Sequence, residues 1–202
     1  MHELILASQS PRRKMLLEKA GYRFRTLPIE VSEIPGENLN PIEQICDWAR
    51  LKAAAAVKAL KLSESKDILI LSADTVVVLE GQILGKPKNT TEACETLGRL
   101  SGKKHQVITA YCLWDLGPDR FILRHVVSDV EFKVLKSEEI EDYVASGDPM
   151  DKAGSYGIQG EARKFVKSFS GSFDNIVGLP VEDVDKTVTE NGWSLARAPQ
   201  KN

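Results

Sequence analysis

Residues 4–21 read LILASQSPRRKMLLEKAG, an apolar run that passes directly into a helix start. Leu4–Ala7 predict a short buried strand. Ser10 is suited to cap a helix, Pro11 fits the first helical position, and Gly21 follows the end of the pattern. A strand that feeds a helix in this way is typical of α/β proteins.

Two arginines, Arg12 and Arg13, fall in the first turn of this helix. The helix dipole favours acidic side chains at that position, so basic ones are a local conflict of the kind expected at functional sites. Free backbone N–H groups together with two guanidinium groups and the nearby Ser8 form a candidate anion site, suited to phosphate. The alternative is a solvated basic turn.

The rest of the chain mixes helices, buried strands and hairpins. Asn40 and Glu43 form a capping box at the start of a long helix that runs to about Leu60. Further helices are predicted at Thr91–Leu100, Ser137–Ala145 and Val181–Thr189, and strands at Tyr22–Pro28, Ile68–Leu71, Val76–Leu79, Gln82–Leu84, Gln106–Trp114 and Phe121–Val134. Asp148–Gly160 and Ser168–Asn175 are predicted loops. We therefore expect an α/β fold with a mixed sheet, a single domain over residues 1–190 and a loose C-terminal tail over 191–202.

Composition excludes several classes of function. The 202 residues include 27 Lys and Arg against 29 Asp and Glu, a net charge of −2. This near-neutral balance gives no general footprint for nucleic acid. No apolar run approaches the roughly 18 residues that span a bilayer, and the N-terminal apolar stretch precedes its basic residues, the opposite of a secretory signal. We expect a cytoplasmic protein without nucleic-acid or membrane partners.

The three cysteines and three histidines also limit the chemistry. No C-x-x-C pair is present and the histidines are far apart, so neither a zinc site nor a disulfide framework is supported. Any metal would be held by carboxylate and phosphate oxygens, which indicates Mg²⁺ or Mn²⁺.

Three further polar clusters stand out. Asp74 and Thr75 follow an apolar strand, where α/β proteins place chemistry at the rim of the sheet; the alternative is a turn-forming aspartate. Lys86 lies between a glycine and a proline. The stretch 151–160 reads DKAGSYGIQG, and a loop so rich in glycine and polar groups usually has a function.

Taken together, these segments resemble one family. Residues 6–13 (LASQSPRR), 73–77 (ADTVV), 85–87 (GKP), 151–160 (DKAGSYGIQG) and 170–180 (SGSFDNIVGLP) are similar, in order and spacing, to the Maf-type nucleoside triphosphate pyrophosphatases. The blocks SPRR, ADT and YGIQG resemble the dTTP/UTP pyrophosphatase branch. The resemblance implies a mixed-sheet α/β fold with two lobes around a cleft, related to the inosine triphosphate pyrophosphatases. It also implies a divalent metal cation, a cytoplasmic location and often a homodimer.

The resemblance further implies a reaction and a set of site residues. A nucleoside triphosphate would be split into the monophosphate and pyrophosphate, with Asp74 as the general base that deprotonates water. The triphosphate would be held by Ser8, Arg13, Lys52 and Lys86. Glu33 would ligate the metal together with Asp74. The base would be selected by Arg12, Thr75 and Gln159, the last of which can present both a donor and an acceptor to a thymine or uracil edge.

Two other functions stay open at this point. One is a nucleotide-binding regulator of cell division and septum formation that does not catalyse a reaction. The other is a pyrophosphatase of broader range that clears damaged or non-canonical nucleotides. Pyrophosphate release separates catalysis from binding, and relative kcat/KM values across nucleotides separate the two enzymes.

Overall fold

The computed structural model describes residues 1–36, 39–60 and 67–198, and the chain folds into two compact units. Unit 1 consists of Met1–Asp74, Thr109–Val126 and Gly178–Asn202, and unit 2 consists of Thr75–Ile108 and Val127–Val177. These two units correspond to the two lobes that the resemblance implies. That residues 1–190 form a single domain stays a prediction.

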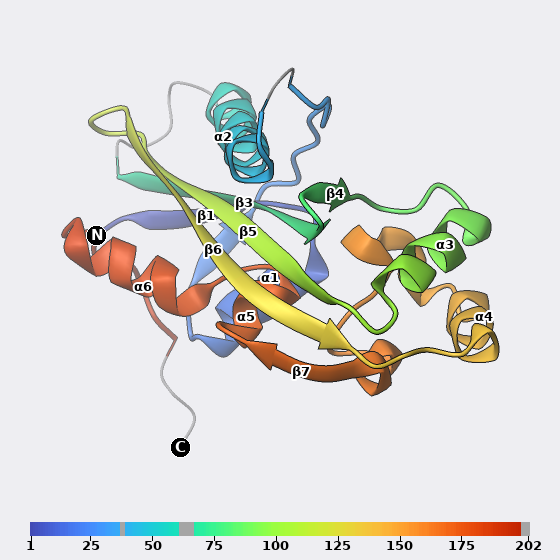
Figure 1. The fold of residues 1–202 in the computed structure, drawn as a ribbon. Helices are drawn as coiled ribbons and strands as arrows, with labels where there is room; N and C mark the ends of the chain where they lie inside the picture. The colour runs from blue at the N-terminus through green and yellow to red at the C-terminus, as the bar shows by residue number, and fades with distance from the viewer. Residues whose placement is uncertain (37–38, 61–66, 199–202) are drawn as a thin grey trace. The chain divides into compact units, whose positions relative to one another are not determined.

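The strands form one mixed seven-stranded sheet of the order β2-β1-β3-β5-β6-β7, with β4 paired to β3 (Figure 1). The strands are β1 Glu3–Ala7, β2 Phe24–Thr26, β3 Ile68–Leu79, β4 Gln82–Leu84, β5 Lys104–Asp115, β6 Arg120–Phe132 and β7 Val166–Ser170. β1 pairs in parallel with β2 and β3, whereas the β3–β4 and β6–β7 pairs are antiparallel. The expected α/β class with a mixed sheet is confirmed.

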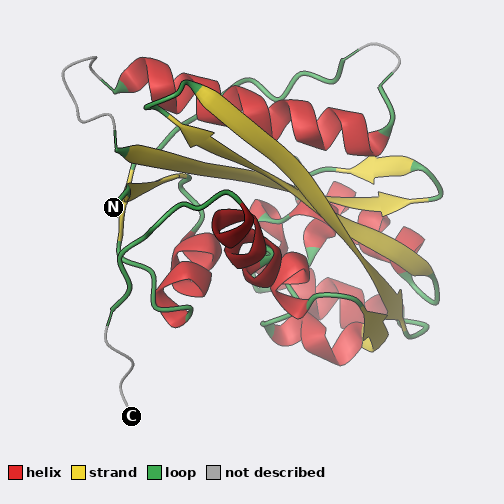
Figure 2. Ribbon diagram, turned by 90° about the vertical axis from the view of Figure 1, so that its left-hand side faces the viewer, coloured by secondary structure: helices red, strands yellow, loops and turns green. Residues whose placement is uncertain are grey.

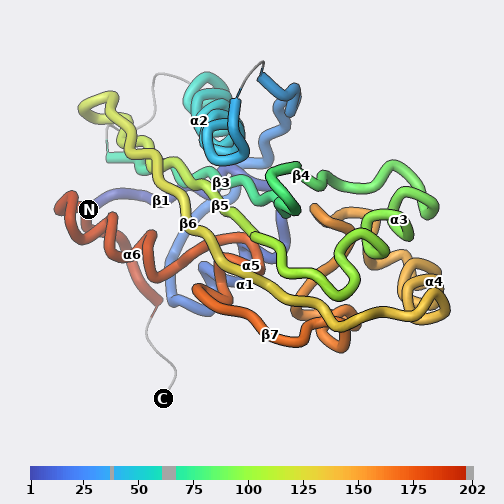
Figure 3. The backbone as a smooth tube through the Cα atoms, viewed as in Figure 1, coloured from blue at the N-terminus to red at the C-terminus, as the bar shows by residue number. Residues whose placement is uncertain are grey.

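Helices flank the strands. They are α1 Pro11–Lys19, α2 Pro41–Ala59, α3 Thr90–Leu100, α4 Ser137–Ala145, α5 Phe173–Val177 and α6 Val181–Glu190. In unit 1, α2 lies over one face of the sheet, and α1 and α6 lie on the other (Figure 2). In unit 2, α3 and α4 lie side by side (Figure 3). None of the helices within the described residues is long and apolar enough to cross a membrane.

The predicted helix starts of unit 1 are confirmed. The Arg13 backbone N–H donates to Ser10 Oγ at 3.5 Å at the start of α1, and Pro11 takes the first helical position. The helix ends before Gly21, which has a φ of +78°. Asn40 and Glu43 form the expected capping box of α2. These signals are local, so the sequence alone can show them.

β3 corrects the expected end of the first apolar strand. The sequence predicts that this strand ends at Ser72–Thr75 and places Asp74 at the rim of the sheet. β3 instead runs unbroken from Ile68 to Leu79, so Asp74 lies near its middle. The polar residues stay in the strand because α2 supplies their partners: the Ser72 hydroxyl donates to the Ala49 carbonyl oxygen at 2.6 Å, and Asp74 accepts from a lysine of α2.

The prediction of a loop at Ser168–Asn175 is wrong. Val166–Ser170 forms β7, which pairs with β6 and places Ser170 opposite Asp129. α5 follows at once, and the Asn175 backbone N–H donates to Ser172 Oγ at 3.1 Å at its start. β7 is largely exposed and polar, so its strand character depends on pairing with β6 and not on an apolar pattern.

The tail that follows α6 is bound to unit 1 over its described part. The His2 backbone N–H donates to the Ser194 carbonyl oxygen at 2.7 Å, and the Ala198 backbone N–H donates to the Gly21 carbonyl oxygen at 2.7 Å. The prediction of a loose tail is therefore wrong for residues 191–198, and residues 199–202 lie outside the described residues.

An aromatic cluster forms the core of unit 2 and anchors the glycine-rich stretch. Edge-to-face contacts join His105, Phe132, Tyr143, Tyr156 and Phe165. Tyr156 belongs to the predicted loop Asp148–Gly160, which contains short 3-10 turns at Asp148–Asp151 and Ala153–Ser155. The loop is thus fixed to the core at its centre.

Candidate functional site

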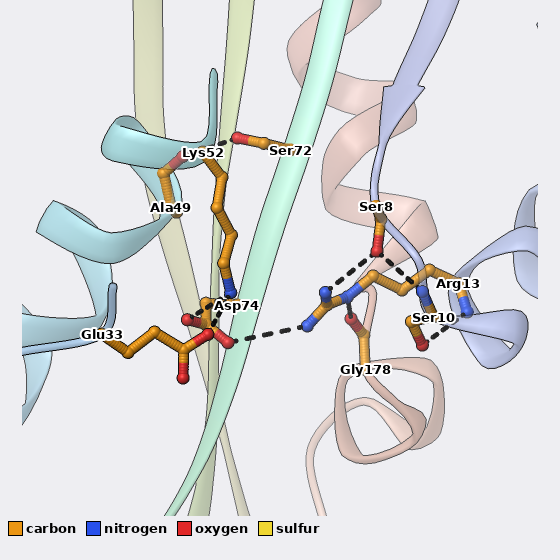
Figure 4. A network of polar contacts seen from close by, with 9 residues as sticks. All are labelled: Ser8, Ser10, Arg13, Glu33, Ala49, Lys52, Ser72, Asp74 and Gly178. Atoms are coloured by element: carbon orange, nitrogen blue, oxygen red, sulfur yellow. Dashed lines mark hydrogen bonds and ion pairs between the residues drawn. The ribbon is translucent and has the colours of Figure 1, made fainter. Parts of the chain in front are cut away.

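The centre of the candidate site is the carboxylate of Asp74 (Figure 4). Lys52, from α2, donates from Nζ to Asp74 Oδ2 at 2.8 Å. The same Nζ donates to Glu33 Oε1 at 2.7 Å. Glu33 lies in the irregular segment between β2 and α2. One ammonium group therefore bridges two carboxylates.

Arg13 approaches Asp74 from α1. Its Nη2 lies 4.0 Å from Asp74 Oδ1, its Nη1 donates to Ser8 Oγ at 3.3 Å, and its Nε donates to the Gly178 carbonyl oxygen at 2.8 Å. Burial lowers the pKa of the Arg13 guanidinium, and the charge of Asp74 opposes that shift. The side chain is held at three points, so its charge has a fixed position.

Ser8 links the end of β1 to the start of α1. Besides accepting from Arg13, its Oγ accepts the Ser10 backbone N–H at 3.1 Å. The turn therefore brings a hydroxyl, a helix N-terminus and a guanidinium group together, which is the chemistry of an anion site. We name the connected set Ser8, Arg13, Glu33, Lys52, Asp74 and Gly178 the Asp74 network; all of its members belong to unit 1.

Two contributors to the site are missed by sequence reasoning. The Gly178 carbonyl oxygen orients Arg13. The Ser72 hydroxyl of β3 donates to the carbonyl oxygen of Ala49 in α2, three residues before Lys52. Gly178 has a φ of +132°, a conformation that favours glycine, so its position in the quoted stretch 170–180 is the one available signal. The Ser72 bond leaves no signal in the local sequence.

Arg12 and Thr75 are neighbours of the Asp74 network along the chain. Arg12 lies in the first turn of α1, close enough for its charge to contribute to the lowered pKa of Arg13. Thr75 is half-buried in β3, directly after Asp74, and belongs to unit 2.

Lys86 and Gln159 lie in unit 2, and a backbone hydrogen bond joins their segments. The Gly154 N–H donates to the Gly85 carbonyl oxygen at 3.0 Å, which brings the segment of Lys86 beside the glycine-rich loop. Lys86 and Gln159 are both exposed.

Lys152 forms ion pairs within the glycine-rich loop. Its Nζ donates to Asp148 Oδ1 at 2.9 Å and to Asp151 Oδ1 at 2.7 Å. Asp148 also accepts from the Tyr143 hydroxyl at 2.7 Å. Lys152 therefore stabilises the conformation of this loop.

The donor set around Asp74 fits a hard cation. Glu33 and Asp74 provide two carboxylates whose oxygens converge on one point, the position of Lys52 Nζ. Within the described residues, no three or more His, Cys, Asp or Glu side chains gather in a way that could hold a metal ion. Two carboxylates suit Mg²⁺ or Mn²⁺, because such ions commonly take their remaining ligands from water and from substrate phosphates.

Comparison with known proteins gives the family. The family model described as Maf-like protein matches residues 3–191. The chain belongs to the Maf-like protein family. Within this family it is similar to a dTTP/UTP pyrophosphatase of Bdellovibrio bacteriovorus, with 46% identity over 93% of this chain and 97% of the relative. The dTTP/UTP pyrophosphatase of Pectobacterium atrosepticum is 45% identical, covering 92% of this chain and 91% of the relative. That of Aliivibrio fischeri is 42% identical, covering 91% and 95%.

Proposed function

We propose that this Maf-like protein hydrolyses dTTP and UTP to the nucleoside monophosphate and pyrophosphate. The observation that carries the proposal is the Asp74 carboxylate, which Lys52 contacts at 2.8 Å and Arg13 approaches to 4.0 Å, beside the N-terminus of α1. The similarity to dTTP/UTP pyrophosphatases along more than nine-tenths of the chain supports the choice of substrate.

Asp74 acts as the general base in this scheme. Its carboxylate has about four lone-pair sites, so it can contact a cationic group and also accept a proton from water. The water oxygen forms a bond to the α-phosphorus, the bond from that phosphorus to the bridging oxygen breaks, and pyrophosphate leaves with the bridging oxygen. The water proton goes to Asp74.

Cationic groups bind the triphosphate and stabilise the negative charge on the leaving pyrophosphate. Arg13, Lys52 and Lys86 supply positive charge, and Ser8 with the first turn of α1 supplies neutral donors. Arg13 is already held by Ser8 and Gly178, so little reorganisation is needed when substrate binds.

Base selection is assigned to Arg12, Thr75 and Gln159. Gln159 is exposed, so its amide is available to a ligand. The amide can donate to a carbonyl oxygen and accept from a ring N–H, as the edge of thymine or uracil requires.

A divalent cation would be held by Glu33 and Asp74. When bound, it would neutralise phosphate charge. We expect chelation with EDTA to abolish turnover and Mg²⁺ or Mn²⁺ to restore it. Full turnover of exhaustively chelated protein would contradict a role for the metal.

We further propose that the protein acts on free nucleotides in the cytoplasm. The net charge of −2 supports this, because a nucleic-acid-binding surface usually carries a marked excess of positive charge.

Hydrolysis of dTTP in ¹⁸O-labelled water tests the proposal. Attack at the α-phosphorus places the label in dTMP, and attack at the β-phosphorus places it in pyrophosphate. We expect dTMP and pyrophosphate as products, with the label in dTMP. Release of orthophosphate and dTDP, or nucleotide binding without turnover, would contradict the proposal; binding alone would favour a regulatory nucleotide-binding protein.

A further inference from the structure

The Lys52 side chain occupies the point where the two candidate metal ligands converge. Its Nζ lies 2.7 Å from Glu33 Oε1 and 2.8 Å from Asp74 Oδ2 (Figure 4). A cation bound by these same two oxygens would have to displace the ammonium group, because both cannot occupy one position.

The charges of the four groups in contact at this point sum to zero. Glu33 and Asp74 carry two negative charges, and Lys52 and Arg13 carry two positive ones. The side chains of Lys52 and Asp74 are 12% and 11% exposed, so water screens their attraction only weakly. A free divalent cation therefore meets a neutral set of groups whose best oxygens are already in contact with an ammonium group.

We propose that Lys52 is an internal counter-ion that prevents a free divalent cation from binding Glu33 and Asp74 until the nucleotide arrives. This inference rests on the proposed function. A triphosphate provides new negative partners for Lys52 and Arg13, and the two carboxylates then become available. The metal enters with the nucleotide, and Lys52 exchanges carboxylate contacts for phosphate contacts. Lys52 thus determines the order of binding as well as the charge at the site.

Titration of the nucleotide-free protein with Mn²⁺ alone, followed by electron paramagnetic resonance, tests this order. We expect weak binding to the wild type. Lys52→Met removes the charge and keeps much of the side-chain volume, so we expect it to tighten Mn²⁺ binding by about tenfold or more. Lys52→Arg keeps a positive charge and should leave binding weak. Lys58→Met, an exposed lysine of the same helix, is the matched control and should change nothing.

Thermal denaturation gives a second readout. Mn²⁺ alone should raise the Tm of Lys52→Met and leave that of the wild type unchanged, because a ligand stabilises the state it binds. If Lys52→Met tightens binding no more than Lys58→Met does, the inference is wrong.

If Lys52→Met does not fold, Lys52→Gln, which also removes the charge, takes its place. In the wild type, Mn²⁺ binding to the protein should be weak without nucleotide and become tight with the non-hydrolysable α,β-methylene-dTTP, after subtraction of the Mn²⁺ that this nucleotide binds in the absence of protein. Tight binding without nucleotide, or weak binding with it, would overturn the inference. Pyrophosphate release from dTTP by the wild type is measured in parallel. Its absence refutes the proposed function, whereas its presence with unaltered Mn²⁺ binding in Lys52→Met refutes only the order of binding.

Discussion

Asp74→Asn separates the chemical role of the carboxylate from its structural role. Asparagine has nearly the same shape as aspartate and keeps one oxygen that can accept a hydrogen bond from Lys52. Lys52 Nζ also keeps its hydrogen bond to Glu33. What is lost is one charged partner of Lys52 and the attraction of Arg13 at 4.0 Å. The variant should therefore fold and fail mainly in proton transfer.

The cost to stability follows from these contacts. A hydrogen bond to a charged group contributes roughly 1.5–3 kcal/mol, and since Lys52 keeps Glu33 we expect the free energy of unfolding to fall by about 1–3 kcal/mol. For a chain of this size that lowers Tm by roughly 2–12 °C. Loss of the general base should lower kcat by about 10²–10⁴-fold. In the absence of divalent metal, nucleotide binding should be unchanged or tighter, because a negative charge near the phosphates is removed.

Three measurements check the variant. Circular dichroism follows Tm, isothermal titration with α,β-methylene-dTTP gives affinity, and pyrophosphate release gives kcat. Asp142→Asn removes an exposed carboxylate on α4 and serves as the control, with unchanged values expected. An Asp74→Asn variant that binds nucleotide and retains near-normal kcat would remove Asp74 from the mechanism.

Three further substitutions test unit 2. Gln159→Ala should lower kcat/KM for dTTP and UTP by about 5–150-fold, equivalent to a loss of ~1–3 kcal/mol, and narrow their advantage over other triphosphates; an equal loss on every nucleotide would refute base selection. Burial lowers the pKa of His105 to about 4 from 6.5, and its Nε2 lies 2.7 Å from the Tyr156 hydroxyl. Between pH 6.5 and about 4 the unfolded chain therefore binds a proton that the folded chain does not, so the free energy of unfolding should fall as the pH decreases through this range. Urea unfolding of His105→Phe should show a smaller fall, and a pH dependence identical to that of the wild type would exclude His105 as the cause. Gly154→Ala should destabilise the protein by more than ~1 kcal/mol, because φ is +67° and the new Cβ would lie 2.6 Å from Val77 Cγ2; an unchanged Tm would refute this packing argument.

Local signals explain the parts of the fold that could be predicted. Ser10, Pro11 and Gly21 bound α1, and Asn40 with Glu43 begins α2, through contacts within a few residues. The sequence carries such signals because caps and turns are satisfied by neighbouring side chains and backbone groups.

Long-range partners explain the errors. The polar residues of β3 predict the end of a strand, but the Ser72 hydroxyl donates to the carbonyl oxygen of Ala49, 23 residues away. β7 is a strand because β6 lies beside it, and the tail is held by backbone bonds to residues near the N-terminus. A single-sequence pattern does not encode such partners.

The sequence predicts the residues of the candidate site better than it predicts their arrangement. The resemblance names Asp74, Glu33, Lys52 and Arg13, and the structure brings them together. The resemblance does not reveal that Lys52 bridges two carboxylates, because this contact depends on how α2 packs against β3. Backbone acceptors such as the Gly178 carbonyl oxygen are also hidden, since every residue has one.

Pyrophosphate release by the purified wild-type protein with Mg²⁺, measured across dTTP, UTP, CTP, ITP and 7-methyl-GTP, tests the proposed hydrolysis of dTTP and UTP. We expect kcat/KM values for dTTP and UTP that exceed those for the other three nucleotides by about tenfold or more. Equal turnover of all five would indicate a pyrophosphatase of broad range. No pyrophosphate from dTTP or UTP would contradict the claim outright.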